Sequence, residues 1–202
     1  MIVDALHADA LSSRPRCAWA GDDPLYQRYH DDEWGVALRG DRPLFEKLTL
    51  EAFQSGLSWI TILRRREGFR RAFDGFDWHR IAAYDDDDVA RLMADEGIIR
   101  NRAKIDATIA NARVLLEWLD AEPGGLDALI WSHQPPARSE RPTTLSEIPA
   151  QTPDSQALAR ALKQRGLRFV GPTTAYALMQ SAGLVDDHVT GCWRAEAAFR
   201  AP

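Results

Sequence analysis

Long apolar runs are missing from this 202-residue sequence, and none approaches the ~18 residues that mark a membrane-spanning helix. The first fifteen positions carry Asp4, His7 and Asp9, where a secretory signal peptide needs a cationic start and an apolar stretch. We therefore expect a cytoplasmic protein that does not engage a membrane, with a flexible N-terminal extension at residues 1–15.

An excess of basic charge is also missing. The chain has 25 lysine and arginine residues against 30 aspartate and glutamate residues, which gives a formal net charge of −5. This balance argues against a protein that coats nucleic acid indiscriminately, so any contact with DNA must come from local basic patches. Segments 97–105 and 160–185 offer such patches because they contain basic residues and no acid. Solvated helix faces would give the same pattern.

Strand patterning is the third absence, because no stretch alternates apolar and polar residues with an enrichment in Val, Ile and Thr. Apolar residues instead recur at helical spacing, which predicts an all-α fold. The length suits a monomer with one domain at 16–194, built from two packed helical lobes, and a tail at 195–202. Prolines crowd residues 132–153 and predict a connector between the lobes.

Start and stop signals divide the chain into helices. Asp41 with Pro43 predicts the cap and first turn of a helix that carries Leu44, Leu48 and Glu51 on one face. The other helices are expected at 58–73, 86–94, 101–121, 154–165 and 172–182.

Cysteine is scarce, since the chain has only Cys17 and Cys192. Each has a histidine near it, His30 or His188, and the spacing of four between His188 and Cys192 suits two ligands on one helical turn. A Cys₂His₂ site for one Zn²⁺ ion, joining the two ends of the chain, follows as a hypothesis. Four protein ligands would make that zinc structural. Buried, reduced cysteines are the alternative. Three other histidines could replace one ligand: His7, His79 and His133.

Residues 163–174 predict two helices joined by a short turn with a glycine at each end. The second helix begins at Pro172, and its free backbone N–H groups suit a phosphate oxygen. Such a turn holds a duplex without reading its sequence, although an ordinary helical corner looks the same. The candidate DNA contacts are Arg165, Gly166, Arg168, Gly171, Thr173 and Thr174.

Glu51 is hard to explain as a core residue. It shares the face of Leu44 and Leu48, where an unpaired carboxylate taken out of water is costly. A cationic ligand would compensate that cost, and aromatic rings could stack on a planar base. The alternatives are an ion pair with an arginine such as Arg64 or Arg102, and aromatic residues that belong to the core. The aromatic candidates are Trp19, Tyr26, Tyr29, Trp34 and Trp59.

Short blocks in these segments carry a resemblance to a known family. They are Arg16-Cys-Ala-Trp19, Asp23-Pro-Leu-Tyr26, Tyr29-His-Asp-Asp-Glu-Trp-Gly35, Leu50-Glu51, Gln54-Ser-Gly-Leu-Ser-Trp-Ile60, Gly97-Ile-Ile-Arg-Asn-Arg102, Thr144-Leu-Ser-Glu-Ile-Pro149, Phe169-Val-Gly171 and Asp187-His188 with Cys192. Over about residues 16–194 the chain resembles the type I family of 3-methyladenine DNA glycosylases.

The resemblance implies a helix-hairpin-helix DNA glycosylase fold whose structural zinc is held by Cys17, His30, His188 and Cys192. It implies that Glu51 accepts hydrogen bonds from the alkylated base, with a pocket lined by Tyr29, Trp59, Trp19 and Trp34. Leu57 is the candidate to fill the gap left in the duplex.

The activity implied is base-excision repair of double-stranded DNA that contains alkylated bases, with free 3-methyladenine as product. The methylated base is already a cation, so it leaves as a neutral purine and needs no strong acid. Catalysis then reduces to flipping the nucleotide, holding the base and admitting water. Segment 183–192 contains no lysine, which speaks against a Schiff-base lyase step.

Asp186 departs from the family pattern, which usually has asparagine there. We interpret it as a turn cap or a support for His188, while a catalytic role toward the sugar cation or water is the alternative. Two rival functions remain at this level: a zinc-stabilised DNA-binding module without chemistry, and a zinc hydrolase or deaminase that uses Asp187 or Glu33.

Overall fold

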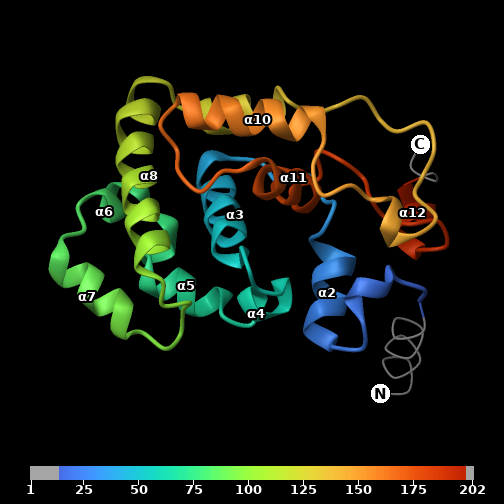
Figure 1. The fold of residues 1–202 in the computed structure, drawn as a ribbon, viewed down its shortest axis with the longest axis horizontal. Helices are drawn as coiled ribbons and strands as arrows, with labels where there is room; N and C mark the ends of the chain where they lie inside the picture. The colour runs from blue at the N-terminus through green and yellow to red at the C-terminus, as the bar shows by residue number, and fades with distance from the viewer. Residues whose placement is uncertain (1–13, 199–202) are drawn as a thin grey trace, which may run out of the picture.

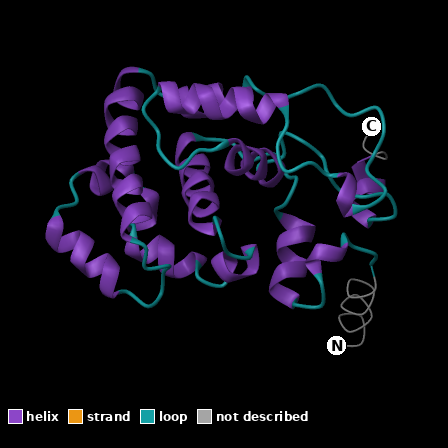
Figure 2. Ribbon diagram, in the orientation of Figure 1, coloured by secondary structure: helices purple, strands orange, loops and turns teal. Residues whose placement is uncertain are grey.

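One central helix, α3 (Asp41–Gln54), organises the fold (Figure 1). Nine of its residues are buried, and helices from both halves of the chain pack against it. The computed structural model describes residues 14–198, and none of these forms a strand (Figure 2). The predicted all-α fold class is confirmed. Within the same residues, no helix combines the length and apolarity that crossing a membrane requires.

The other α-helices, in chain order, are α2 (Pro24–Asp32), α4 (Trp59–Leu63), α5 (Arg66–Ala72), α6 (Trp78–Ala82), α7 (Asp86–Ala94), α8 (Arg102–Ala121), α9 (Gly125–Trp131), α10 (Pro153–Gln164), α11 (Pro172–Ser181) and α12 (Trp193–Ala198). Short 3₁₀ turns lie at η1 (Ala18–Ala20), η2 (Asp74–Phe76) and η3 (Leu145–Glu147). The helices predicted at 86–94, 101–121 and 172–182 are confirmed to within one residue.

Asp41 is not the cap of its own helix, which is a correction to the sequence prediction. Gly40, with φ of 92°, holds the cap position of α3. The Asp41 carboxylate instead accepts hydrogen bonds from the backbone N–H groups of Gly124 and Asp127, each at 2.8 Å. It therefore caps the N-terminus of α9, more than 80 residues later in the chain.

Two other helix boundaries were predicted wrongly. The segment 58–73 is two helices, because the chain turns at Arg64 and Arg65 between α4 and α5. Helix α10 begins one residue before Asp154, and its cap is Thr152, which exchanges hydrogen bonds with Ser155.

The segment 132–153 lacks α-helix up to residue 152, as its prolines predict, and α10 begins at its last residue; the segment runs around the outside of the molecule (Figure 2). Its division of the domain into two lobes stays a prediction. At the C-terminal end, residues 195–198 continue α12, so the tail assigned from sequence does not begin at 195. The rest of that tail and residues 1–13 of the N-terminal extension lie outside the described residues.

The core contains five phenylalanine side chains with no exposed surface, from α3, α5, η2 and the junction between α5 and η2. The ring of Phe53 lies 4.8 Å from that of Phe69 and 6.1 Å from that of Phe73, at centroid separations typical of aromatic pairs. This cluster fixes the C-terminal end of α3, so that Glu51 is held by a rigid helix.

Helix α5 approaches the loop before α8 so closely that Gly68 has no room for a side chain. A Cβ atom at Gly68 would overlap the carbonyl oxygen of Gly97. Because backbone atoms must move to relieve that overlap, we expect Gly68→Ala to lower the free energy of unfolding by about 2 kcal/mol or more. Urea unfolding measures this change. Gly171→Ala is the control, because its added methyl meets nothing within 4 Å; equal losses in both variants would contradict the prediction.

Candidate active site and metal centre

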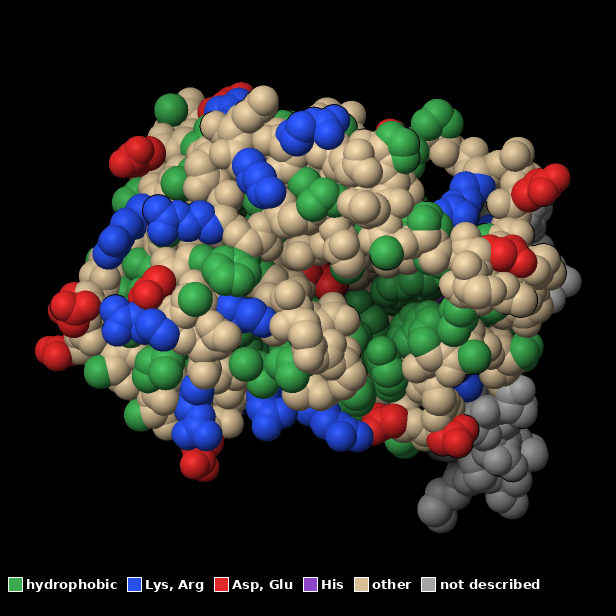
Figure 3. Space-filling model, in the orientation of Figure 1, with side chains coloured by type: hydrophobic (Ala, Val, Ile, Leu, Met, Phe, Trp, Pro, Cys, Tyr) green, Lys and Arg blue, Asp and Glu red, His purple; other side chains and the backbone are tan. Residues whose placement is uncertain are grey.

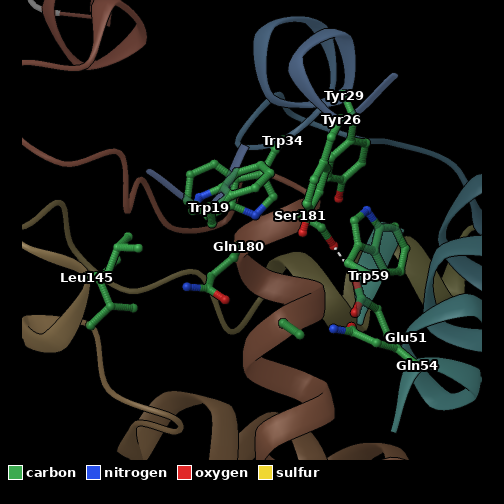
Figure 4. A pocket seen from close by; sticks show the side chains of 12 residues that line it. Trp19, Tyr26, Tyr29, Trp34, Glu51, Gln54, Trp59, Leu145, Gln180 and Ser181 are labelled. Carbon is green, nitrogen blue, oxygen red and sulfur yellow. Dashed lines mark hydrogen bonds between the residues drawn. The ribbon is translucent and has the colours of Figure 1, made fainter. Parts of the chain in front are cut away.

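A cavity of about 260 Å³ opens where α2, α3, α4 and α11 meet. In Figure 3 it forms part of a hollow lined by hydrophobic side chains, and Figure 4 shows its walls from close by. Five of the twelve lining residues are aromatic. The lining residues are Trp19, Tyr26, Tyr29, Trp34, Glu51, Gln54, Trp59, Leu145, Ile148, Ala177, Gln180 and Ser181.

The structure places Glu51 in the cavity wall. Its side chain is 5% exposed, and one carboxylate oxygen accepts a hydrogen bond of 2.8 Å from the Ser181 hydroxyl (Figure 4). Neither Arg64 nor Arg102 is its partner, since Arg64 pairs with Asp23 and Arg102 with Asp106. The alternative of an arginine ion pair is therefore excluded.

Burial governs the ionisation of Glu51. Removal from water raises the pKa of its carboxyl to about 7, although attraction to Lys47 and the hydrogen bond from Ser181 both lower it. A carboxylate in that position is poorly compensated by the protein alone. The site is thus suited to a ligand that brings positive charge or hydrogen-bond donors.

Five aromatic side chains contribute to the cavity wall. The Trp19 ring lies 4.9 Å from that of Tyr26 and 5.1 Å from that of Trp34, and the Tyr29 ring lies 5.4 Å from that of Trp59. The Trp59 indole N–H is buried and has no hydrogen-bond partner among the described residues. These side chains offer flat apolar faces and one donor to a planar molecule.

A second cluster lies directly behind this wall. Cys17, His30, His188 and Cys192 are all buried, and their ligand atoms all lie within 4.8 Å of one another. The Cys192 sulfur is 3.4 Å from Nε2 of His30 and 3.6 Å from Nδ1 of His188. The four residues predicted from sequence thus come together in a group that can hold a metal ion. His79 and His133 are not part of it, and His7 lies outside the described residues.

Surrounding hydrogen bonds fix which histidine nitrogen faces the cluster. Nδ1 of His30 lies 2.8 Å from the Asp31 carboxylate, which also accepts hydrogen bonds from Arg16 and Trp193. Nε2 of His188 lies 3.3 Å from the Trp34 carbonyl oxygen. Each imidazole therefore turns its other nitrogen inward, as expected of metal ligands.

The chain reaches His188 and Cys192 through a turn, whereas the spacing had suggested a helix. Gly191 makes this turn with φ of 84°, and the Cys192 N–H donates to the Val189 carbonyl. The hydrogen bond from Cys17 lowers the pKa of the Cys192 thiol, which favours a thiolate there.

The acidic residues near the cluster are already engaged. Asp186 accepts a hydrogen bond from the His188 backbone N–H at 3.1 Å and pairs with Arg141 at 2.7 Å. It does not line the aromatic cavity. Asp187 accepts hydrogen bonds from Tyr176 and Gln180, and Glu33 pairs with Arg66. Four ligands without a neighbouring free carboxylate do not favour the hydrolase or deaminase alternative.

The turn between α10 and α11 has a backbone conformation set by a buried side chain. Asn111 of α8 accepts from the Arg168 N–H at 2.7 Å and donates to the Arg168 carbonyl at 3.1 Å. Phe169 follows with φ of 56° and is 44% exposed. Thr173 and Thr174 lie in the first turn of α11, as predicted. Lysine and arginine side chains spread over α8 and α10 on the same face as the cavity (Figure 3).

Leu57 lies in a tight loop at the rim of the cavity and is 41% exposed. Gly56, with φ of 84°, makes the turn. The buried Lys104 ammonium donates to the carbonyl oxygens of Phe53 and Ser55, each at 2.9 Å, and so holds the start of this loop to α8.

Comparison with known proteins identifies the family. The model of the family described as methyladenine glycosylase matches residues 19–195. The chain belongs to this family.

Two curated relatives of this chain are DNA-3-methyladenine glycosylases. The DNA-3-methyladenine glycosylase 1 of Escherichia coli (strain K12) is 50% identical over 180 residues, which cover 88% of this chain and 95% of the relative. The DNA-3-methyladenine glycosylase of Haemophilus influenzae is 44% identical over 179 residues, with 88% and 96% covered.

Solved structures agree with the fold of this methyladenine glycosylase. A crystal structure of 3-methyladenine DNA glycosylase I superposes with a TM-score of 0.84 at 48% identity, covering 89% of this chain and 98% of that one. A structure of the Staphylococcus aureus enzyme has a TM-score of 0.81 at 32% identity, covering 88% and 95%.

The sequence reasoning missed several residues of the methyladenine glycosylase site. Ser181 and Gln180 reach the cavity from α11, and no local signal connects them with Glu51. Lys47 was detectable, because it precedes Glu51 by one helical turn and carries the opposite charge. Asn111 gave no signal, since its partner lies 57 residues away.

Ionisation of Glu51 should lower the unfolding free energy of the protein. Its pKa rises from 4.5 to about 7 on folding, so the contribution to stability present below pH 4.5 is lost as the pH rises through 7. That gap corresponds to about 3 kcal/mol. Because Gln cannot ionise, we expect Glu51→Gln to gain about 2 to 3 kcal/mol of unfolding free energy over wild type between pH 5 and pH 8.

Urea unfolding at the two pH values measures this gain. Glu117→Gln, at an exposed position of α8, is the control and should track wild type. A difference between Glu51→Gln and wild type that is the same at both pH values would contradict the assigned burial cost.

Proposed function

We propose that this chain hydrolyses the N-glycosidic bond of 3-methyladenine in alkylated double-stranded DNA, as the first step of base-excision repair. The names of the curated relatives support this activity, and so does the Staphylococcus aureus structure, described as the basis of 3-methyladenine recognition. The observation that carries the proposal is the buried Glu51 carboxylate in an aromatic cavity.

Binding of the base follows from the charges in the cavity. A 3-methylated adenine in DNA is a cation, and an aromatic face attracts a cation more strongly once water is removed. Tyr29 and Trp59 would stack against the flipped base, with Trp19 and Trp34 completing the wall. Glu51 would accept hydrogen bonds from the base, and the positive charge of the base would compensate the burial of the carboxylate. Gln180 and Ser181 complete the polar edge.

The chemical step needs little from the protein because the leaving group is already charged. When the bond to the sugar breaks, its electron pair neutralises the purine, so no acid has to protonate it. The developing sugar cation is then attacked by water, which supplies the hydroxyl of the abasic site and loses its other proton to the solvent. Lys47 is buried and does not line the cavity, so no lysine among the cavity residues can form a Schiff base. The reaction should stop at the abasic site.

Contacts with the duplex would come from the turn between α10 and α11 and from Leu57. As in a helix-hairpin-helix motif, the backbone N–H groups at Gly171, Thr173 and Thr174 would bind a phosphate without reading sequence. Arg165 and Arg168 would add positive charge beside Gly166. The exposed Leu57 would fill the space left by the flipped nucleotide.

Zinc is the metal that fits the Cys₂His₂ cluster best. Tetrahedral zinc, with Zn–S of about 2.3 Å and Zn–N of about 2.0–2.1 Å, separates a sulfur and a nitrogen ligand by about 3.6 Å. The measured separations are 3.4 to 3.6 Å. Two thiols and two imidazoles, with the imidazole rings oriented by hydrogen bonds, are a typical structural zinc site. Zinc there would tie the N-terminal segment to the C-terminal segment.

Asp186 fits a supporting role in this scheme. It braces the turn that carries His188, and Arg141 occupies its second oxygen, so it is not oriented toward the sugar. The monomeric state and the cytoplasmic location stay predictions.

Release of free base tests the activity. Purified protein incubated with methylated DNA should release 3-methyladenine, identified by chromatography. Because Glu51→Gln removes a charge-assisted contact and Trp59→Ala removes a stacking face, each should lower the release rate by about ten- to a hundredfold. Glu117→Gln and Trp78→Ala, both away from the cavity, are the matched controls. Wild-type rates in both cavity variants would remove the site assignment, and no release by wild type would remove the function.

Metal analysis tests the cluster separately. We expect one zinc ion per chain in the purified protein, and loss of zinc in Cys17→Ser and His188→Ala. Because the metal joins distant segments, its removal should lower the unfolding free energy by several kcal/mol. Replacement of zinc by cadmium should leave base release close to wild type, since a structural ion does no chemistry. Activity that varies with the metal in a fully folded protein would contradict the structural role.

A further inference from the structure

Lys47 is a second buried charge beside the aromatic cavity. Lys47 is only 8% exposed and lies one helical turn before Glu51 on α3. Its ammonium nitrogen is 5.0 Å from the Tyr29 ring centre and 5.3 Å from the Trp59 ring centre. Lys47 does not line the aromatic cavity, so it contacts the walls of the site without reaching the base.

Burying an ammonium group in this space has a high cost in free energy. Burial lowers the pKa of Lys47, and attraction to Glu51 is the strongest influence that opposes the shift. The rings of Tyr29 and Trp59 stabilise a cation only in part. An apolar side chain of similar length would pack there at lower cost. The charge of Lys47 therefore calls for a functional explanation.

That explanation does not lie in contact with the substrate. A positive charge near the cavity repels a cationic base, so Lys47 would weaken binding if it acted on the base alone. Its favourable effect is on Glu51, because its attraction opposes the cost of holding a buried carboxylate in the ionised form.

The other charged groups around Glu51 are neutralised or remote from its carboxylate. From α2, Tyr26 and Tyr29 stay uncharged because burial raises their pKa values. At the end of α2, Glu33 forms an ion pair with Arg66 of α5. Helix α11 offers Ser181 and Gln180, and α4 offers Trp59, none of which carries a charge.

On α3 itself, and on α8 and α9 which pack against it, the charged groups also have partners of their own, as Asp127 of α9 has in Arg39. Glu46 of α3 pairs with Arg70 of α5. Lys104 of α8 is bound to carbonyl oxygens at the end of α3. Lys47 is therefore the cation in the described part of the chain that acts directly on the Glu51 carboxylate.

We propose that Lys47 is a positioning residue that favours the ionised form of Glu51 in the free enzyme and thereby sets the acid limit of base excision. The inference rests on the proposed function of Glu51. A protonated Glu51 would lose half its acceptor capacity and its attraction for a cation, so the enzyme would lose activity at acidic pH.

The test is the pH profile of kcat/KM for release of 3-methyladenine from methylated DNA, measured in Lys47→Met and Lys47→Arg beside wild type. Methionine keeps the length and removes the charge, whereas arginine keeps the charge. We expect the acid limb of Lys47→Met to move up by about one to three pH units and that of Lys47→Arg to stay near wild type. An acid limb in Lys47→Met that coincides with wild type, with only the height of the profile changed, would overturn the proposal.

A second measurement keeps the test valid if Lys47→Met folds poorly. Thermal unfolding and circular dichroism identify such a failure, and Lys47→Gln then takes its place. Binding of the 3,9-dimethyladeninium cation, which carries the charge that the base has in DNA, should show the same upward shift without catalysis when it is followed by tryptophan fluorescence against pH. Failure of the proposed function would appear differently, as absence of base release from wild type or as full activity of Glu51→Gln.

Discussion

The cost of removing the Glu51 carboxylate from water is the constraint on which the site depends. The protein compensates it only in part, through one hydroxyl from Ser181 and one buried ammonium from Lys47. A ligand that is both flat and positively charged would offset the remaining cost, and this gain would add to its binding free energy. A neutral base gains stacking in this cavity but leaves the carboxylate uncompensated, so discrimination comes from charge as well as shape.

The Cys₂His₂ cluster matters because three of its residues are joined, through the chain or through a hydrogen bond, to residues of the aromatic wall. Cys17 precedes the turn with Trp19, His30 follows Tyr29, and His188 contacts the Trp34 carbonyl. Each of these ligands is thus coupled to a ring of the cavity. A metal ion there would hold the rings in place without touching the reaction, which explains why a closed ligand set lies so close to the site.

Local signals predicted the parts of the fold that are locally determined. Helices such as α8, with Asn101 as its cap, begin and end where short-range chemistry dictates. Helix α9 was missed because the carboxylate that caps it belongs to Asp41, in a helix far away in the sequence. The segment 58–73 was not divided into two helices because nothing in its own sequence indicates the approach of Gly68 to Gly97. Likewise Glu51 stood out on an apolar face, whereas Ser181, 130 residues away, could not be connected with it.

The same charges that favour binding also favour release of the product. While the base is joined to DNA it is a cation, which Glu51 in its proposed role would attract. Once the bond breaks, the purine is neutral and that attraction would be lost. The interaction with Glu51 is therefore strongest before bond cleavage, so it cannot by itself be the main source of rate acceleration. On this proposal the cavity would select and orient a base that is already prone to leave, and a residue that tunes the ionisation of Glu51 would control how tightly the damaged base is held before water attacks.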